Sequence, residues 1–154
     1  MAITTKHVAG GAGVVALCVA MIGVHEGLRT HAYKDPARAT LATICYGETQ
    51  GVYFGETKTR VECNAMLASR IADYLGPVDS MIPGLPDNRR VAYTDFAYNA
   101  GVTALRRSRI PGYEAAGNVQ AACHELTRYV YAGGRKLPGL VRRRADEEKL
   151  CLNG

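Results

Sequence analysis

The chain has 154 residues, which is enough for one compact domain and too few for two independent ones. Hydrophobic residues make up 47% of it and charged residues 21%, a balance that excludes a disordered protein. The formal net charge of +5 favours an anionic polymer or surface as partner, whether nucleic acid, lipid headgroups or a bacterial wall.

An uncharged apolar segment, residues 8–24, lies near the start of the chain. It is at the low end of the length that spans a membrane, about 20 apolar residues, and is rich in Gly and Ala. The sequence after it is a poor signal-peptidase site, and Leu17 before Cys18 is unlike a lipoprotein signal. A buried core helix is the alternative. We expect residues 1–25 to be an uncleaved, weak signal anchor that can later leave the membrane, followed by a catalytic domain over residues 26–154.

Residues 30–57 predict a small antiparallel sheet with turns, because short apolar pieces alternate there with β-branched residues, Tyr and Gly. A helix is expected to follow Thr59, which forms a capping-box pattern with Glu62. Apolar residues continue at helical spacing, and the pair Gly76–Pro77 predicts the end of this helix.

Three further helices are expected in the second half of the chain. One covers residues 87–101, one begins after the N-cap residue Asn118 and ends at Gly133–Gly134, and the last covers about residues 140–150. A small β lobe followed by a larger helical lobe is an α+β arrangement, with a cleft expected between the lobes.

The chain has five cysteines and four histidines, and neither set has the spacing of a metal site. We therefore expect no metal and no cofactor. Scattered cysteines in a small chain are typical of disulfides formed in an oxidising compartment such as a periplasm. Buried free thiols are the alternative.

Glu26 is the candidate acid, since it lies just past the apolar segment in the run HEGLRTHAYKD. Cleavage of a glycosidic bond requires an acid for the leaving oxygen and a second polar group for the water or the developing charge. We expect a helix to begin at Glu26 beside the β lobe, where partial burial in a cleft favours a protonated carboxyl. Asp35 and Thr43 follow at spacings that could complete such a site, although spacing alone does not establish one.

The residues around these three resemble the phage-type (T-even-like) lysozymes, glycoside hydrolase family 24. The similar blocks occur in the family's order over roughly residues 25–152, namely residues 26–29, 32–35, 43–47, 95–101, 131–134, 139–140 and 142–144. The resemblance implies a lysozyme-like α+β fold. It also implies a muramidase that hydrolyses the β-1,4 bond between N-acetylmuramic acid and N-acetylglucosamine in peptidoglycan and so lyses the host cell.

Carried over by position, the resemblance makes Glu26 the general acid, Asp35 the carboxylate that assists the attack of water, and Thr43 the hydroxyl that positions that water. The family inverts the anomeric centre, which requires the two carboxyl groups to stand roughly 6.5–9.5 Å apart. The plainer interpretations are an N-terminal helix charge for Glu26, a turn residue for Asp35 and a strand residue for Thr43.

The resemblance also implies support for the substrate. Asn99 matches a cleft amide that contacts sugar, Tyr46 lies in the block after Thr43, and Arg143 matches a basic residue paired with the acid. Two of the three arginines at residues 142–144 are expected to form a solvated basic face. The chain departs from the family in a longer turn over residues 36–40 and in Glu48, where His is frequent.

The proximity of Glu26 to the apolar segment resembles the signal-anchor-release endolysins of lambdoid-type phages, which wait in the inner membrane until it is depolarised. We expect export by the host, tethering to the inner membrane through residues 8–24, and release to the periplasm. The expected partners are peptidoglycan glycan strands, which a monomer would bind. Nucleic acid is disfavoured, because the basic residues form no patch interleaved with aromatics.

Cys18 is the odd cysteine and lies inside the apolar segment. After release it could attack a disulfide that involves Cys45 and reshape the site, or it could be a passive small apolar residue. Four cysteines allow three connectivities, among which the sequence does not choose. We favour Cys45–Cys63 and Cys123–Cys151.

Two other functions remain open. A lytic transglycosylase needs an acid/base Glu but no second carboxylate, so the presence of Asp35 and Thr43 favours hydrolysis. A membrane-anchored wall-binding module would keep its biological effect after Glu26→Gln, whereas an enzyme would lose it.

Overall fold

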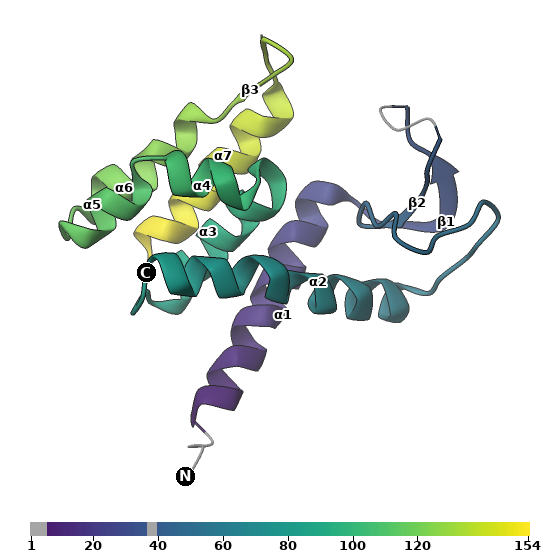
Figure 1. Ribbon diagram of the computed structural model, residues 1–154, viewed down its shortest axis with the longest axis horizontal. Helices are drawn as coiled ribbons and strands as arrows, with labels where there is room; N and C mark the ends of the chain where they lie inside the picture. The colour runs from purple at the N-terminus through teal and green to yellow at the C-terminus, as the bar shows by residue number, and fades with distance from the viewer. Residues whose placement is uncertain (1–5, 37–39) are drawn as a thin grey trace.

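The computed structural model describes the backbone of residues 6–36 and 40–154, and the side chains of residues 11–36 and 40–154. Figure 1 shows most of the helices gathered into one lobe and the strands β1 and β2 set apart from it, with α1 and α2 between them. The predicted α+β arrangement of a small β lobe and a larger helical lobe is confirmed.

Helix α1 (Lys6–Glu26) contains the apolar segment. Its side chains Val14, Cys18 and Ile22 recur once per turn and are fully buried, in a core shared with α2 and α3. Among the described residues, no helix is long and apolar enough to cross a membrane. Residues 1–5 of the expected anchor lie outside the described part.

The end of α1 corrects one expectation, because Glu26 is the last residue of a helix and not the first. Nothing in the apolar run interrupts the helix before Gly27, whose φ of 73° is left-handed. The Gly27 N–H donates to the Gly23 carbonyl at 3.1 Å, so glycine closes the helix directly after the carboxyl group.

The β lobe is the antiparallel pair β1 (Arg29–Lys34) and β2 (Ala42–Cys45), as predicted. Tyr33 pairs with Thr43, which places Asp35 directly after the end of β1. A further bridge joins His31 to Thr57. The expected longer turn over residues 36–40 includes residues 37–39, which lie outside the described part.

Helix α2 (Arg60–Met81) begins with the predicted capping box, in which Thr59 and Glu62 exchange hydrogen bonds. Its predicted end at Gly76–Pro77 is wrong, since the helix continues through Pro77. A proline removes one helical hydrogen bond but does not end a helix that tertiary packing holds. Val78, the residue directly after Pro77, is fully buried and contributes to that packing.

The helical lobe is built around α3 (Asp87–Ala100), which packs against α1, α2 and α7. The short helices α4 (Val102–Arg107) and α5 (Ile110–Ala115) follow it, and neither was expected. The chain ends with α7 (Pro138–Leu152), close to the expected range.

The helix after Asn118 is shorter than predicted. Helix α6 (Val119–Glu125) and the 3-10 turn η2 (Leu126–Arg128) are followed by a hairpin of β3 (Tyr131–Ala132) and β4 (Arg135–Lys136). The predicted stop, Gly133–Gly134, is the turn of this hairpin. Both glycines have positive φ, as a tight hairpin turn requires.

Two disulfides join elements of the fold, and they are the two pairs that we favoured. Cys45–Cys63 joins β2 to α2, and Cys123–Cys151 joins α6 to α7. Cys18 is free and buried.

Candidate active site

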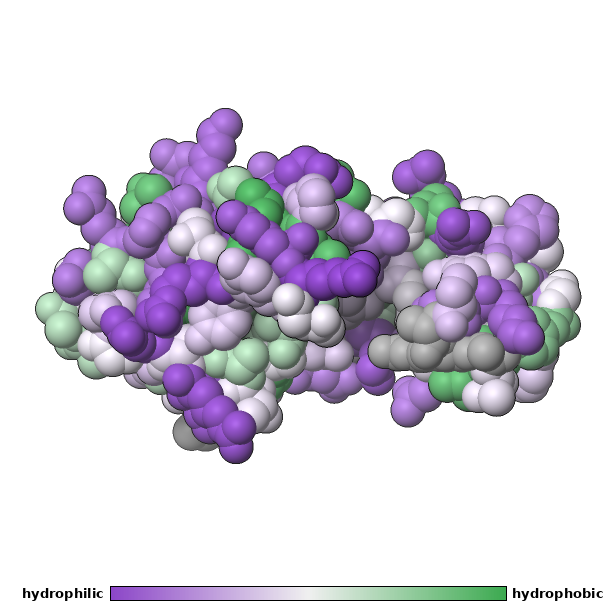
Figure 2. All heavy atoms as spheres, turned by 90° about the horizontal axis from the view of Figure 1, so that it is seen from above, coloured by the Kyte–Doolittle hydropathy of each residue, from purple (hydrophilic) through white to green (hydrophobic). Residues whose placement is uncertain are grey.

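A polar cavity of about 430 Å³ lies where the two lobes meet. Glu26 at the end of α1, Asp35 after β1 and Asn99 in the last turn of α3 all line it, together with Tyr33, Tyr46, Gly47, Glu48, Thr49, Arg70, Tyr74 and Tyr98. In Figure 2 the molecular surface narrows between the helical lobe and the β lobe. Glu26 also borders a second cavity of about 650 Å³, whose wall is formed by residues 26–33.

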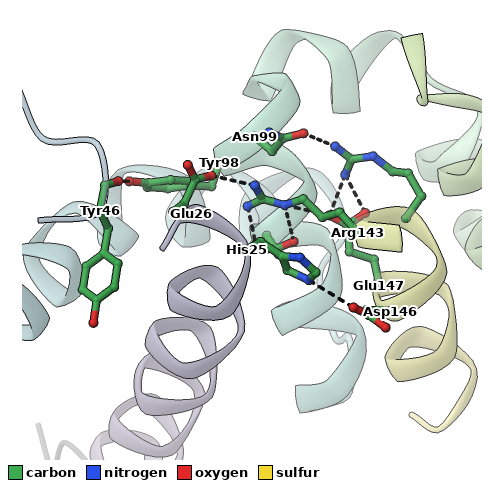
Figure 3. Close-up of polar contacts among 10 residues, drawn as sticks. His25, Glu26, Tyr46, Tyr98, Asn99, Arg143, Asp146 and Glu147 are labelled. Atoms are coloured by element: carbon green, nitrogen blue, oxygen red, sulfur yellow. Dashed lines mark hydrogen bonds and ion pairs between the residues drawn. The ribbon is translucent and has the colours of Figure 1, made fainter. Parts of the chain in front are cut away.

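Glu26 is held by one guanidinium, which Figure 3 shows reaching it from α7. Arg143 Nη1 donates to Glu26 Oε1 at 2.6 Å. The other edge of the same guanidinium donates to Asp95, with Nε to Oδ2 and Nη2 to Oδ1 at 2.9 Å each. Helix α3 therefore fixes Arg143 by two hydrogen bonds, and Arg143 in turn fixes the candidate acid.

The interior of this cluster is buried. The side chains of Asp95 and Glu147 are 0% exposed and that of Arg143 is 5% exposed, whereas Glu26 is 26% exposed. Burial by itself favours a raised pKa for Asp95, but hydrogen bonds with Glu147 and Arg143 outweigh burial and hold that pKa below its usual value. Burial, then a hydrogen bond to Asp95, raises the pKa of Glu147 well above its usual value.

Arg144 corrects the expectation of two solvated arginines beside Arg143. Its side chain is 1% exposed, and its Nη1 donates to both carboxylate oxygens of Glu147 at 2.5 and 2.6 Å. Its Nε donates to the Tyr129 carbonyl at 3.0 Å, and its Nη2 donates to Asn99 Oδ1. Arg142 alone of the three is exposed. Asn99, expected to contact sugar, lines the cavity and is oriented by Arg144.

Thr43 lies in a different environment from Glu26 and Asp35. Its side chain is on the buried strand β2, it is 1% exposed, and it is not among the residues that line the cavity. Within the described part of the chain, no group forms a hydrogen bond with its Oγ1. Buried hydroxyl groups usually have a partner, so this one is unusual.

Tyr46 connects the β lobe to the helices. Its hydroxyl donates to Asn64 Oδ1 at 2.6 Å, and its carbonyl accepts from the Tyr98 hydroxyl at 3.1 Å. Burial, then the charge of Glu26, raises the pKa of Tyr98 to about 12. Tyr98 is therefore a neutral donor at physiological pH that anchors the loop after β2 beside Glu26 (Figure 3).

Sequence reasoning gave no role to Asp95, Glu147 or Tyr98. Helical spacing was the available signal, because Asp95 and Tyr98 are one turn apart on α3, and Glu147 is one turn from Arg143 on α7. That signal becomes specific only once α1, α3 and α7 are packed together.

No group of His, Cys, Asp and Glu in the described part of the chain could hold a metal ion. The chemistry that this arrangement offers is that of carboxyl groups. One carboxyl is placed by a buried guanidinium at the cavity wall, and a second carboxyl, Asp35, lines the same cavity.

Comparison with known proteins gives matches over most of the chain. A sequence model of the family described as phage lysozyme matches residues 23–147. The SAR-endolysin of Enterobacteria phage P21 is 31% identical over 159 residues, which cover 97% of this chain and 95% of that one.

Two solved structures of P1 phage endolysin Lyz are also similar to this chain. The active form has a TM-score of 0.80 and 29% identity and covers 90% of this chain and 84% of its own. The secreted inactive form has a TM-score of 0.58 and is 25% identical, and the match covers 90% of this chain and 94% of that one.

Proposed function

Because this chain belongs to the phage lysozyme family, we propose that Glu26 is the general acid with which it hydrolyses the β-1,4 bond between N-acetylmuramic acid and N-acetylglucosamine. The family and the P1 endolysin structures make it a glycoside hydrolase of the lysozyme type and an endolysin that lyses peptidoglycan. The observation that carries the proposal is the placement of Glu26 at the cavity wall by Arg143.

The hydrogen bonds of Glu26 are consistent with an acid. Arg143 donates to Oε1, and no described residue donates to Oε2. Oε2 is the oxygen that would deliver its proton to the leaving glycosidic oxygen, after which Arg143 would stabilise the carboxylate that remains.

In this proposal, Asp35 and Thr43 act on the attacking water molecule. Asp35 lines the cavity with Glu26 and acts as the carboxylate that assists the attack of water. Thr43 pairs with Tyr33 of the cavity wall, and its hydroxyl, which has no hydrogen-bond partner among the described residues, would position that water. This division of roles implies inversion at the anomeric carbon.

Analysis of the products tests the reaction type. Purified peptidoglycan digested in water labelled with ¹⁸O is expected to give muropeptides whose new reducing ends carry the label. Anhydro sugars, which lack one water, would indicate a lytic transglycosylase. The α or β anomer that forms first, read by proton NMR, tests inversion.

We also propose that residues 1–25 are a releasable membrane tether and that residues 26–154 are the catalytic domain. The relative from phage P21 is called a SAR-endolysin, which supports this proposal. The fold is more similar to the active form of the P1 endolysin than to its secreted inactive form, and α1 is packed into the core, as a released form requires. The chain would be exported, held at the inner membrane through residues 8–24, and released to the periplasm, where it acts on glycan strands as a monomer.

Cell fractionation tests the tether. Before the membrane potential is collapsed, the full-length protein is expected in the membrane fraction, and afterwards in the periplasmic fraction. A protein that is soluble throughout, or that stays in the membrane after collapse, would contradict release.

A further inference from the structure

We propose that Asp95 is a positioning residue of the hydrolysis, which acts on Glu26 through Arg143. Asp95 holds the guanidinium in place and offsets its charge, so that Arg143 orients Glu26 without fixing it as a carboxylate. This inference rests on the proposed role of Glu26 as the acid.

The hydrogen bonds of the Arg143 guanidinium link Asp95 to Glu26. Its Nε and Nη2 both donate to Asp95, which leaves Nη1 to donate to Glu26. A planar guanidinium with one edge fixed has a defined orientation for its remaining nitrogen. The position of Glu26 Oε1 is therefore set by α3 through Asp95, although no residue of α3 forms a hydrogen bond with Glu26 in the described part of the chain.

Burial makes this support rigid. Asp95 lies in a fully buried stretch of α3 over residues 91–97, and Arg143 lies on α7, which packs against α3. Of Asp95, Arg143 and Glu26, only Glu26 is substantially exposed, and it lines the cavity. Burial therefore restricts the motion of Asp95 and leaves Glu26 freer to move.

The charges of the cluster around Arg143 also support this role of Asp95. The cluster contains two guanidinium groups, on Arg143 and Arg144, and three carboxyl groups, on Glu26, Asp95 and Glu147. Asp95 accepts two hydrogen bonds from Arg143 and supplies a buried negative charge beside it, so this guanidinium keeps a counter-charge when Glu26 carries the proton that an acid must deliver. Without Asp95, Arg143 would keep its hydrogen bond to Glu26 but lose the two hydrogen bonds that fix its other edge.

The other charged groups near Glu26 do not replace Asp95. Glu147 Oε1 is 3.6 Å from Arg143 Nε but accepts two short hydrogen bonds from Arg144. The His25 imidazole, next to Glu26, lies 3.4 Å from Asp146 and faces that carboxylate. Asp35, Glu48 and Arg70 line the same cavity as Glu26.

The test is Asp95→Asn, which keeps the shape of the side chain and removes its charge. We expect kcat on peptidoglycan to fall about tenfold or more while KM stays within about twofold, because the change affects the acid and not substrate binding. The matched control is Asp79→Asn. Asp79 accepts a similar two-bond fork from Arg90, at 2.8 Å for each bond, but Arg90 makes no contact with Glu26. The control should leave kcat unchanged.

A double-mutant cycle separates positioning from a merely structural role. If Asp95 acts through Arg143, the loss in kcat caused by Asp95→Asn should disappear in an Arg143→Met background. The proposal is overturned if folded Asp95→Asn keeps the wild-type kcat, or if the same loss persists without Arg143.

Folding is monitored by thermal unfolding of each variant. Should Asp95→Asn not fold, Asp95→Glu keeps the charge but displaces the guanidinium, and the same fall in kcat at constant KM is expected. A wild-type kcat for Asp95→Glu would then contradict the proposal. A fully active Glu26→Gln would instead overturn the proposed function itself, so the two failures are distinguishable.

Discussion

At the residue scale, buried polar side chains hold in place the residues that line the site. The resemblance to lysozymes indicated Glu26 and Arg143, and the structure brings them within 2.6 Å. The matching block over residues 95–101 included Asp95 but gave it no role, and Glu147 lay outside the matching blocks. An aspartate in a helix usually lies on the surface, so the sequence predicts an exposed Asp95. The packing of α3 against α7 shows that this aspartate is buried.

At Gly23, helix α1 lies close to the ring of Tyr46, the residue directly after β2. A Cβ atom added there would lie 3.3 Å from the Tyr46 ring. We expect Gly23→Val to destabilise the protein by about 1–3 kcal/mol through overpacking, and to lower activity by displacing Tyr46. Chemical denaturation followed by circular dichroism measures the change.

Gly13 provides the control in the same helix, since a Cβ atom there would meet nothing within 4 Å. Gly13→Ala should be neutral or should stabilise the helix by up to about 1 kcal/mol. Equal effects of the two substitutions would contradict a close contact between Gly23 and Tyr46.

At the scale of elements, sequence reasoning succeeded where a local signal decides the structure. The capping box placed the start of α2, and the alternation of β-branched residues placed the small sheet. It failed at element ends that depend on distant contacts. Helix α2 continues past Pro77 because Val78 is buried, and Gly133–Gly134 serve a hairpin and not a helix end.

The pairing of α7 with α3 makes stability depend on pH. Glu147 has a raised pKa in the folded state, so its contribution to stability is fully present below its unfolded pKa and is lost as pH rises through the folded value. As pH rises above about 4.3, the ordinary pKa of a glutamate, wild-type protein should therefore lose stability relative to Glu147→Gln, which cannot ionise.

Thermal unfolding of the two proteins across this range measures the effect. Asp95 has a lowered pKa and acts in the opposite direction, since its contribution is lost only in acid. A constant difference in melting temperature between wild type and Glu147→Gln would contradict a proton held on Glu147 in the folded state.

At the scale of the whole molecule, the apolar segment serves the catalytic lobe in this structure. A Gly- and Ala-rich helix that is marginal as an anchor can also pack tightly against α2 and α3. The sequence left the anchor and the core helix as alternatives, and the proposed release makes them successive states of one segment. The acid at the end of this helix would then be positioned only after the helix has packed.

The reactivity of the Cys18 thiol should show whether α1 is packed into the core. Burial, then the charge of Asp95, raises the pKa of its thiol to about 12, and the thiolate is the reactive form. In the structure described here, exchange with Cys45–Cys63 is therefore disfavoured, and any such exchange would precede packing. We expect slow alkylation by iodoacetamide in the released protein and fast alkylation in urea. Equal rates would show that Cys18 is not buried after release.

The most direct measurement of the central claim is the loss of turbidity of outer-membrane-stripped cells exposed to purified wild-type protein or to Glu26→Gln. The account predicts rapid clearing by the wild type and a loss of activity of at least about a hundredfold in the variant, because the proton donor is removed while the shape of the cleft is kept. Clearing by folded Glu26→Gln at the wild-type rate would contradict the assignment of Glu26 as the acid.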